Sequence, residues 1–305
     1  MTYVEHRQLG RDGPAVPVIG FGAWPIGGGM GSIDQASAVR TLHHAFEHGV
    51  TLIDTAEAYR GSEEIVGRAV AEWPPGRREK LFIATKVRGD DLSAAHIATA
   101  VEQSLRALRI ERIDLLQAHS WDPQHPIEES MRTFERLVGD GKVRYIGVSN
   151  FSAEQMDAAW QVHAFQALQP RYNVFDREVE TSILPYCLKR GIGVLAHSPL
   201  AKGLLTGKYS AEHVFAADDE RSQMSRFQGH DFRTALQRSA ALERWARERG
   251  HTVLELAIAW VLAHPAVTTC LCGAKSPDQV DDHVRASTWR LTEEDRAEVV
   301  RLVSP

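Results

Sequence analysis

Few cysteines and no long apolar run occur in this sequence, and each shortage excludes a class of protein. Three cysteines among 305 residues, Cys187, Cys270 and Cys272, are too few for a disulfide framework and fit a reducing compartment. No uncharged apolar stretch reaches the roughly 18 residues that span a bilayer. The opening segment, MTYVEHRQLG, holds no apolar signal core. We therefore expect a cytoplasmic chain with no membrane partner.

The sequence also lacks an excess of basic charge and any linker rich in proline or serine. Lys and Arg number 35 against 40 Asp and Glu, which gives a formal net charge of -5. This balance offers no general electrostatic attraction to nucleic acid. Hydrophobic residues make up 43% and charged residues 25% of the chain, an ordinary globular composition that excludes a disordered chain.

Short apolar blocks alternate with amphipathic stretches along the chain. Blocks such as LFIATK and VRYIGVS show little polar alternation, which is typical of parallel strands covered on both faces. Stretches 35–48 and 94–108 have apolar residues at helical spacing. Predicted helix caps are Ser93, Ser152 and Thr292 at the starts and Gly49, Gly141, Gly191 and Gly250 at the ends. Predicted strands are 16–22, 51–55, 81–86, 113–119, 143–149, 167–172, 193–198 and 268–273.

Eight strand–helix alternations without a linker predict an α/β fold, a single (β/α)8 TIM barrel domain over residues 1–305. The length alone would also allow two domains. We expect an extra C-terminal helix and a long loop, 201–229, after the seventh strand. A loop of this length is either a functional flap or locally mobile.

Two glycine-containing segments resemble nucleotide-binding motifs without meeting their requirements. In GFGAWPIGG, Gly20 and Gly22 lack a third glycine at the spacing of the dinucleotide fingerprint. GLLTGKY has one residue too few between its glycines for a phosphate loop, and Tyr where that loop has Ser or Thr. Cys270 and Cys272 lack the second ligand pair of a zinc site and are typical of a buried strand. We therefore predict neither such a loop nor a metal site.

Ionisable side chains stand at the ends of successive predicted strands, where barrel enzymes have their active sites. Asp54 ends TLID and Tyr59 follows in the next loop, Lys86 ends LFIATK, and His119 ends IDLLQAH. Each alone is compatible with an ordinary role in capping, packing or the barrel rim. Burying an unpaired Asp and an unpaired Lys would cost several kcal/mol, so we expect Asp54 and Lys86 to pair.

This set suits the reduction of a carbonyl group. A free phenol has a pKa near 10, and a neighbouring ammonium lowers that pKa towards the range of a useful general acid. Tyr59 could then give a proton to a carbonyl oxygen that gains negative charge, while His119 holds that oxygen by a hydrogen bond. Asp54 would hold Lys86, and no metal is needed.

The motifs DTAEAY, GSEEIVG, IATKV, LLQAH, GKVRYIGVSNF, LQPRYNVFDRE, AHSPLAKGLLTGKY and CLCGAKSPDQVDDH resemble those of the aldo-keto reductase superfamily, in the same order and over essentially the whole chain. The resemblance implies an NADP(H)-dependent oxidoreductase that reduces aldehydes or ketones. It assigns Tyr59 as proton donor, Lys86 and Asp54 as its tuning partners, and His119 as the group that orients a small carbonyl substrate.

The resemblance also implies a cofactor site. Ser149, Asn150 and Gln169 would hold the nicotinamide carboxamide, and Lys275 and Ser276 suit a 2′-phosphate, which favours NADP over NAD. His197 stands where many relatives have an aromatic residue on the nicotinamide, and His283 where they usually have Asn. The full predicted cofactor set is Gly22, Ala23, Trp24, Ser149, Asn150, Gln169, His197, Ser198, Leu200, Gly203, Leu204, Gly273, Lys275, Ser276, Gln279 and Asp282.

Aromatic side chains are the predicted walls of the substrate pocket. Trp24 and Trp121 would line it together with Tyr59 and His119, which favours an apolar or aromatic carbonyl compound, although aromatic walls also bind sugars. Two other functions compete with the reductase. One is a nucleotide-sensing subunit of the same fold with little turnover. The other is a metal-dependent barrel hydrolase or lyase, which would need more His and carboxylate ligands at the strand ends.

Overall fold

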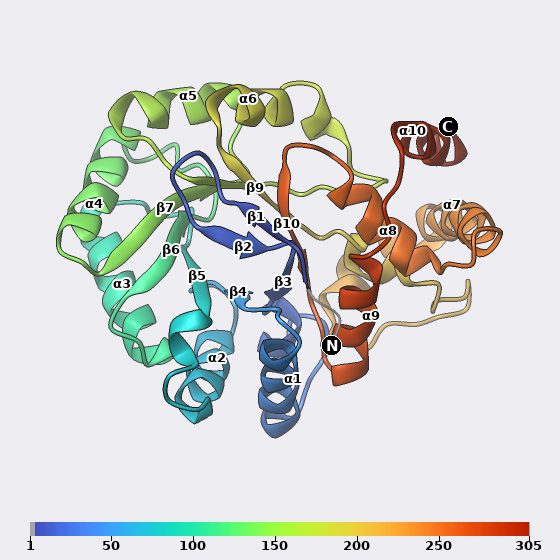
Figure 1. The fold of residues 1–305 in the computed structure, drawn as a ribbon, viewed down its shortest axis with the longest axis horizontal. Helices are drawn as coiled ribbons and strands as arrows, with labels where there is room; N and C mark the ends of the chain where they lie inside the picture. Colours follow the sequence, from blue (N-terminus) through green and yellow to red (C-terminus); the bar gives the residue numbers. More distant parts are fainter. Residues whose placement is uncertain (1–3, 305) are drawn as a thin grey trace.

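Residues 4–304 are described by the computed structural model, whose centre is a closed barrel of eight parallel strands (Figure 1). Each strand pairs with the next along the chain, and the last pairs with the first. This architecture confirms the predicted (β/α)8 barrel. The strands are β3 (Ile19–Gly22), β4 (Leu52–Asp54), β5 (Phe82–Val87), β6 (Ile113–Ala118), β7 (Val143–Ser149), β8 (Ala167–Gln169), β9 (Gly193–His197) and β10 (Val267–Cys272).

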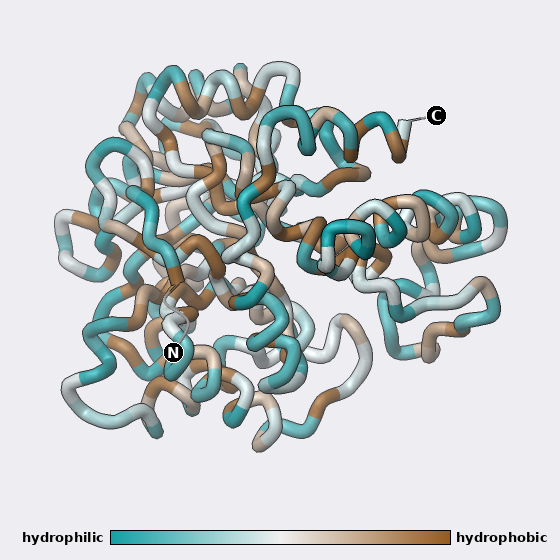
Figure 2. The backbone as a smooth tube through the Cα atoms, turned by 45° about the vertical axis from the view of Figure 1, so that its right-hand side comes forward, coloured by the Kyte–Doolittle hydropathy of each residue, from teal (hydrophilic) through white to brown (hydrophobic). Residues whose placement is uncertain are grey.

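Helices surround the barrel, and most turn one apolar face to it, whereas α8 (Val253–Leu262) is buried on nearly all sides. Along the tube in Figure 2 the helices alternate between hydrophilic and hydrophobic colours, as amphipathic helices do. None of the helices within residues 4–304 is both long and apolar enough to cross a membrane. The surrounding helices are α1 (Gln35–Glu47), α2 (Ser62–Glu72), α3 (Ala94–Leu108), α4 (Ile127–Gly139), α5 (Ala153–Val162), α6 (Ile183–Arg190), α8 (Val253–Leu262) and α9 (Pro277–Ala286).

Two further helices, α7 (Gly229–Arg247) and α10 (Glu293–Val303), pack against each other beside the barrel (Figure 1). Helix α10 is the predicted C-terminal addition, and α7 follows the predicted long loop. That loop folds into short 3-10 turns, η4 (Ala201–Thr206), η5 (Glu220–Gln223) and η6 (Ser225–Phe227).

The helix ends follow the local sequence signals. The Ser93 side chain accepts a hydrogen bond from the His96 N–H at the start of α3. Ser152 and Thr292 each form a reciprocal capping box with the residue three positions on. After α6, Gly191 has φ 68°, a left-handed conformation that glycine adopts at little cost. The predicted caps and the helical spacing of apolar residues therefore located these helix ends correctly.

The predicted first strand, 16–22, is wrong in one respect, because the chain divides it between two sheets. Strand β2 (Ala15–Pro17) pairs antiparallel with β1 (His6–Gln8) in a hairpin that lies across one end of the barrel, and β3 begins only at Ile19 (Figure 1). Leu9 and Val16 of this hairpin segment pack against the inward-facing side chains of the barrel. A continuous apolar run carries no sign of this break, since both parts are buried.

The predicted strand 167–172 is also too long. Strand β8 ends at Gln169, because Pro170 has no N–H to continue the parallel ladder. All three cysteines are free and buried, and Cys270 and Cys272 lie within β10 as expected of core residues.

Candidate active site

A buried ion pair joins the ends of two neighbouring strands. Asp54 is the last residue of β4, and Lys86 lies near the end of β5. The Lys86 Nζ donates hydrogen bonds to Asp54 Oδ1 at 2.5 Å and to the Thr55 carbonyl at 2.9 Å. The two side chains are 0% and 3% exposed, so each charge depends on the other for compensation. The structure thus brings together the two groups that the sequence predicted to pair.

The phenol of Tyr59 lies beside this pair. Its Oη is 3.3 Å from the Lys86 Nζ, and the same nitrogen is 4.8 Å from the centre of the tyrosine ring. The rings of His119 and Trp24 meet the tyrosine ring edge-on, with centroid distances of 5.5 and 4.9 Å. All four predicted catalytic side chains therefore gather at the carboxyl ends of β4, β5 and β6.

Burial and the neighbouring charges together set the protonation of these groups. It raises the pKa of the Tyr59 phenol above its ordinary value, and the Lys86 ammonium offsets only part of that rise. The expected net lowering of this pKa is therefore wrong, because desolvation of the phenolate outweighs the nearby charge. Burial and Lys86 lower the pKa of His119 to about 4. Near neutral pH the site holds a protonated phenol beside an ammonium and an uncharged imidazole.

Gln117 is a member of this cluster that the sequence analysis missed. It is fully buried in β6, and its Nε2 donates to Asp54 Oδ2 at 3.1 Å. Gln169 donates to the same oxygen at 2.8 Å and to the Gln117 Oε1 at 3.1 Å. The available signal was an amide inside an apolar strand two residues before His119, the spacing that places side chains on one face.

The predicted nicotinamide-binding residues form a polar network at the ends of β7, β8 and β9. The Ser149 hydroxyl donates to the Gln169 carbonyl at 2.8 Å, and the Asn150 Nδ2 donates to the His119 carbonyl at 3.2 Å. The His197 Nε2 donates to the Asn150 Oδ1 at 3.0 Å, and burial lowers the pKa of His197 to about 3. This imidazole is therefore neutral and fixes the orientation of the Asn150 amide.

The long loop after β9 is tied to the loop after β3. The Glu220 Oε1 accepts hydrogen bonds from the Trp24 Nε1 at 2.7 Å and the Lys202 Nζ at 2.5 Å. The Glu220 N–H donates to the Gly29 carbonyl at 3.1 Å. We call residues 201–229 the strap. Of the predicted cofactor residues, Gly203 and Leu204 lie in the strap, and Ser198 and Leu200 come just before it. Gly203 has φ 101°.

The predicted phosphate-binding residues lie where β10 leads into α9, beside the loop after β3. Gly273 lies so close to Pro25 that an added Cβ would be 2.6 Å from its ring. The Lys275 N–H donates to the Gln279 Oε1 at 2.8 Å, and its Nζ donates to the Met30 and Gly31 carbonyls. Asp282 pairs with Arg285 at 2.6 Å. Gly22, at the end of β3, lies beside the Gly273 backbone. The Ala23 N–H donates to the Asp54 carbonyl at 2.8 Å.

Trp121, a predicted substrate-binding residue, follows β6. Its ring packs edge-on against the buried ring of Phe151, with a centroid distance of 5.4 Å. The Trp121 side chain is half-buried and packs against the hydrophobic core.

The sequence profile of the Aldo/keto reductase family matches residues 18–304. The chain belongs to the aldo/keto reductase family. It is 39% identical to the aldo-keto reductase YhdN of Bacillus subtilis (strain 168), over 97% of this chain and 92% of that protein. It is also 33% identical to a probable voltage-gated potassium channel subunit beta of Arabidopsis thaliana, over 93% and 91%.

Solved structures agree with this assignment. The glycerol dehydrogenase AKR11B4 from Gluconobacter oxydans matches with a TM-score of 0.87 and 40% identity, over 98% of this chain and 94% of that one. An aldo-keto reductase from Klebsiella pneumoniae in complex with NADPH matches with a TM-score of 0.79 and 30% identity, over 99% and 96%. Aldo-keto reductases bind NADP(H), so the predicted family, fold and cofactor are confirmed.

The residues present in this aldo-keto reductase fit such a cofactor. Ser276 is the N-cap of α9 but makes no side-chain capping bond, which leaves N–H groups of the first turn for an anion. Lys275 stands directly before this helix end and carries a positive charge. Ser149 and Asn150 offer the paired donors and acceptors that an amide needs.

The departure at His283 has a consequence for acid stability. This side chain is 3% exposed, and burial lowers its pKa to about 4. As pH falls below about 6.5, this imidazole binds a proton in the unfolded chain but stays neutral in the folded protein. The free energy of unfolding therefore decreases towards pH 4. Between about pH 7.5 and pH 5 the free energy of unfolding should fall in both proteins. We expect the fall to be about 2 kcal/mol smaller in His283→Asn than in the parent. Urea unfolding at both pH values measures this, and equal losses would contradict it.

Proposed function

We propose that this aldo-keto reductase reduces aldehydes and ketones to alcohols, with Tyr59 as the general acid. The observation that supports this most strongly is the Tyr59 Oη, held 3.3 Å from a buried ammonium that is itself paired with Asp54. Bound NADPH supplies the hydride to the carbonyl carbon. Tyr59 gives its phenolic proton to the carbonyl oxygen, and Lys86 stabilises the phenolate that this transfer leaves.

His119 would position the substrate. Because its imidazole is neutral, it offers one N–H to the carbonyl oxygen without adding a positive charge beside Lys86. Asp54 keeps Lys86 charged and in place, and the amides of Gln117 and Gln169 hold the second oxygen of Asp54. Gln169 thereby links the proposed nicotinamide site to the proton donor.

The substrate is proposed to be an apolar or aromatic aldehyde or ketone. Trp24 lies against the tyrosine ring and would give the site an aromatic wall. Trp121 is the second wall residue in this proposal. The similar glycerol dehydrogenase acts on a polyol, so a small hydroxylated carbonyl compound is the natural comparison. Lys275 and Ser276 are proposed to hold the 2′-phosphate, which would make NADPH the preferred cofactor over NADH.

The test is a panel of carbonyl compounds assayed with NADPH and NADH in parallel at the nicotinamide absorbance band. We expect oxidation of NADPH that depends on substrate, faster with 4-nitrobenzaldehyde than with glyceraldehyde, and slower rates with NADH. The likeness to potassium channel β subunits supports a second candidate, a nucleotide-sensing subunit. Tight binding of NADPH without turnover of any substrate would favour that candidate and contradict the reductase.

The Glu220 contacts lead to a prediction for the strap. Glu220→Ala removes hydrogen bonds of a charged group to Trp24 and Lys202, each worth about 1.5–3 kcal/mol. We expect NADPH to dissociate about tenfold faster and KM for NADPH to rise, with kcat for aldehyde unchanged or higher. Stopped-flow tryptophan fluorescence measures the dissociation. The control is Glu248→Ala on the exposed end of α7, and equal dissociation rates in the two variants would show that the strap does not retain the cofactor.

A further inference from the structure

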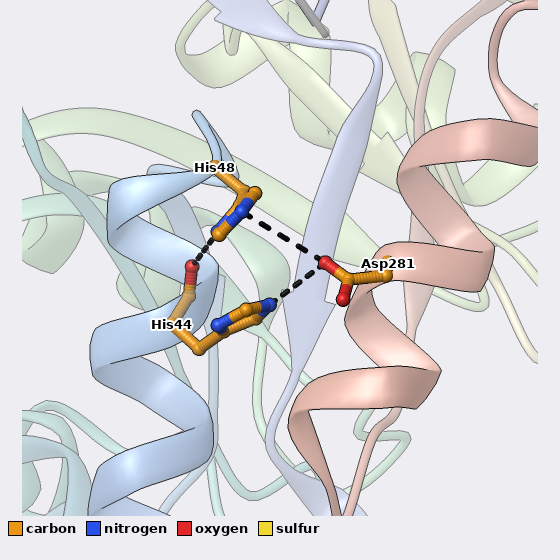
Figure 3. A group of neighbouring side chains, drawn as sticks. All are labelled: His44, His48 and Asp281. Atoms are coloured by element: carbon orange, nitrogen blue, oxygen red, sulfur yellow. Dashed lines mark hydrogen bonds and ion pairs between the residues drawn. The ribbon is translucent and has the colours of Figure 1, made fainter. Parts of the chain in front are cut away.

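Three metal-ligating side chains meet between two helices that surround the barrel, α1 and α9 (Figure 3). His44 and His48 stand one helical turn apart at the end of α1, and Asp281 projects from α9. Their ligand atoms all lie within 4.8 Å of one another. The Asp281 Oδ1 is 2.7 Å from the His44 Nε2 and 3.9 Å from the His48 Nε2. Nothing in the proposed reaction uses these residues.

The hydrogen bonds of the cluster fix where the ring hydrogens lie. The His48 Nδ1 is 2.8 Å from the His44 carbonyl, which can only accept, so Nδ1 carries a hydrogen. A neutral His48 ring therefore presents the lone pair of Nε2 to Asp281. An N–H bonded to a backbone carbonyl with the other nitrogen left open is the usual arrangement of a metal-binding histidine. The His44 Nε2 donates a hydrogen bond to the Asp281 Oδ1.

A nitrogen lone pair and a carboxylate oxygen repel each other, and a cation between them removes that repulsion. The two imidazole rings are stacked with their centroids 4.0 Å apart, and both Nε2 atoms face the same carboxylate oxygen. A metal ion satisfies both rings and the carboxylate at once. With metal–ligand bonds of about 2.0–2.2 Å, the donor atoms of a tetrahedral site lie about 3.3 Å apart. The observed 2.7 and 3.9 Å bracket that separation, so small side-chain rotations complete the site.

We propose that His44, His48 and Asp281 bind Zn²⁺, with solvent in the fourth position. Two imidazoles and one carboxylate suit a borderline transition metal and not Mg²⁺ or Ca²⁺, which take sets of oxygen ligands. This proposal goes beyond the sequence analysis, which predicted no metal site. Within residues 4–304 no other group of three such ligands occurs, and the ligand on α9 is 237 residues from His44. A histidine pair alone would not have identified the site.

Zinc at this position would join the two ends of the fold. Helix α1 follows β3, helix α9 follows β10, and these two strands pair to close the barrel. The ligands come together only in the folded chain, so binding energy adds to the free energy of unfolding. On its other flank α9 is already tied to α8, because Arg285 bridges Asp282 and Glu255. A bound metal would connect α9 to α1 in addition.

The test uses full-length protein freed of metal with EDTA and then titrated with ZnCl₂, by calorimetry and by thermal unfolding. We expect one zinc ion per chain at this site and a rise in Tm with zinc that MgCl₂ does not produce. His48→Gln and Asp281→Asn should each weaken zinc binding by at least about 10–100-fold, the loss that even an outer partner of a ligand causes. His125→Gln is the matched control, because His125 also contacts a carboxylate, that of Asp122, without a third ligand.

Both ligand variants are substitutions at partly exposed positions, and their Tm in EDTA shows whether they fold as the parent does. Equal zinc affinity in the parent, His48→Gln and Asp281→Asn overturns the proposal. A zinc-dependent rise in Tm that persists in the double variant His44→Gln/His48→Gln places the metal elsewhere and also overturns it. Loss of zinc binding in both ligand variants, with the control unchanged, supports the site.

Discussion

Tyr59→Phe is expected to lower kcat for aldehyde reduction by about 10³-fold, within the range that a positioned general acid contributes. The substitution removes one oxygen and retains the ring. Phenylalanine preserves the edge-on contacts with Trp24 and His119, which have centroid distances of 4.9 and 5.5 Å. The walls of the site and the cofactor residues therefore stay in place, and NADPH should bind within about twofold of the parent affinity.

The measurement pairs steady-state reduction of 4-nitrobenzaldehyde with NADPH binding followed by fluorescence. Tyr186→Phe is the control, because it also removes a phenolic hydrogen bond, to Asp157, but on the surface of α6. That control should keep the parent kcat. A Tyr59→Phe variant that reduces aldehyde at the parent rate would refute the assigned proton donor. Loss of both turnover and NADPH binding would mean that the substitution disturbed the site as a whole.

The sequence predicted most of the barrel because its signals are local. The apolar blocks of parallel strands, the Ser93 cap and the Gly191 helix end each depend on a few neighbouring residues. The hairpin of β1 and β2 depends instead on packing against the far end of the barrel, where Leu9 and Val16 fill the interior. No short pattern encodes that contact, and so the sequence merged β2 with β3.

The candidate site was predictable for a topological reason. In a parallel barrel every strand ends at the same face, so Asp54, Lys86 and His119 had to meet once the strands were assigned. What the sequence did not predict depends on distances across the barrel. The Gln117 amide reaches Asp54 from two strands away, and the balance between burial and charge at Tyr59 follows from how deeply the phenol is buried. The hydrogen bond from Trp24 to Glu220 joins residues that are 196 positions apart in the sequence.

Lys86→Met has the largest expected effect on stability. It leaves Asp54 charged, buried and without a cation, and breaking a buried pair from one side costs about 3–5 kcal/mol. Gln117 and Gln169 still donate to Asp54 but carry no charge to offset it. We also expect kcat to fall by at least about 10²-fold, because the phenolate that forms on proton transfer loses its stabilising ammonium. Urea unfolding and steady-state kinetics measure the two effects separately.

The double variant Lys86→Met/Asp54→Asn separates stability from catalysis. Removing both charges should recover most of the lost free energy of unfolding, since a buried pair replaced by neutral groups is often no less stable. The amide oxygen of Asn can still accept from Gln117 and Gln169. Turnover should stay low in both variants, because neither has the ammonium beside Tyr59. Recovered turnover in the double variant would show that Lys86 serves the fold and not the reaction.

The pH dependence of Lys86→Met tests the charge effect directly. Lys86 opposes the rise that burial causes in the pKa of Tyr59, so without the ammonium that pKa moves higher still. Reduction needs the protonated phenol, and its rate falls where the phenol ionises. The alkaline limb of kcat/KM should therefore shift to higher pH in Lys86→Met, whereas a merely structural role for Lys86 would lower the rate at every pH alike. A limb at the parent position would contradict electrostatic coupling between Lys86 and Tyr59.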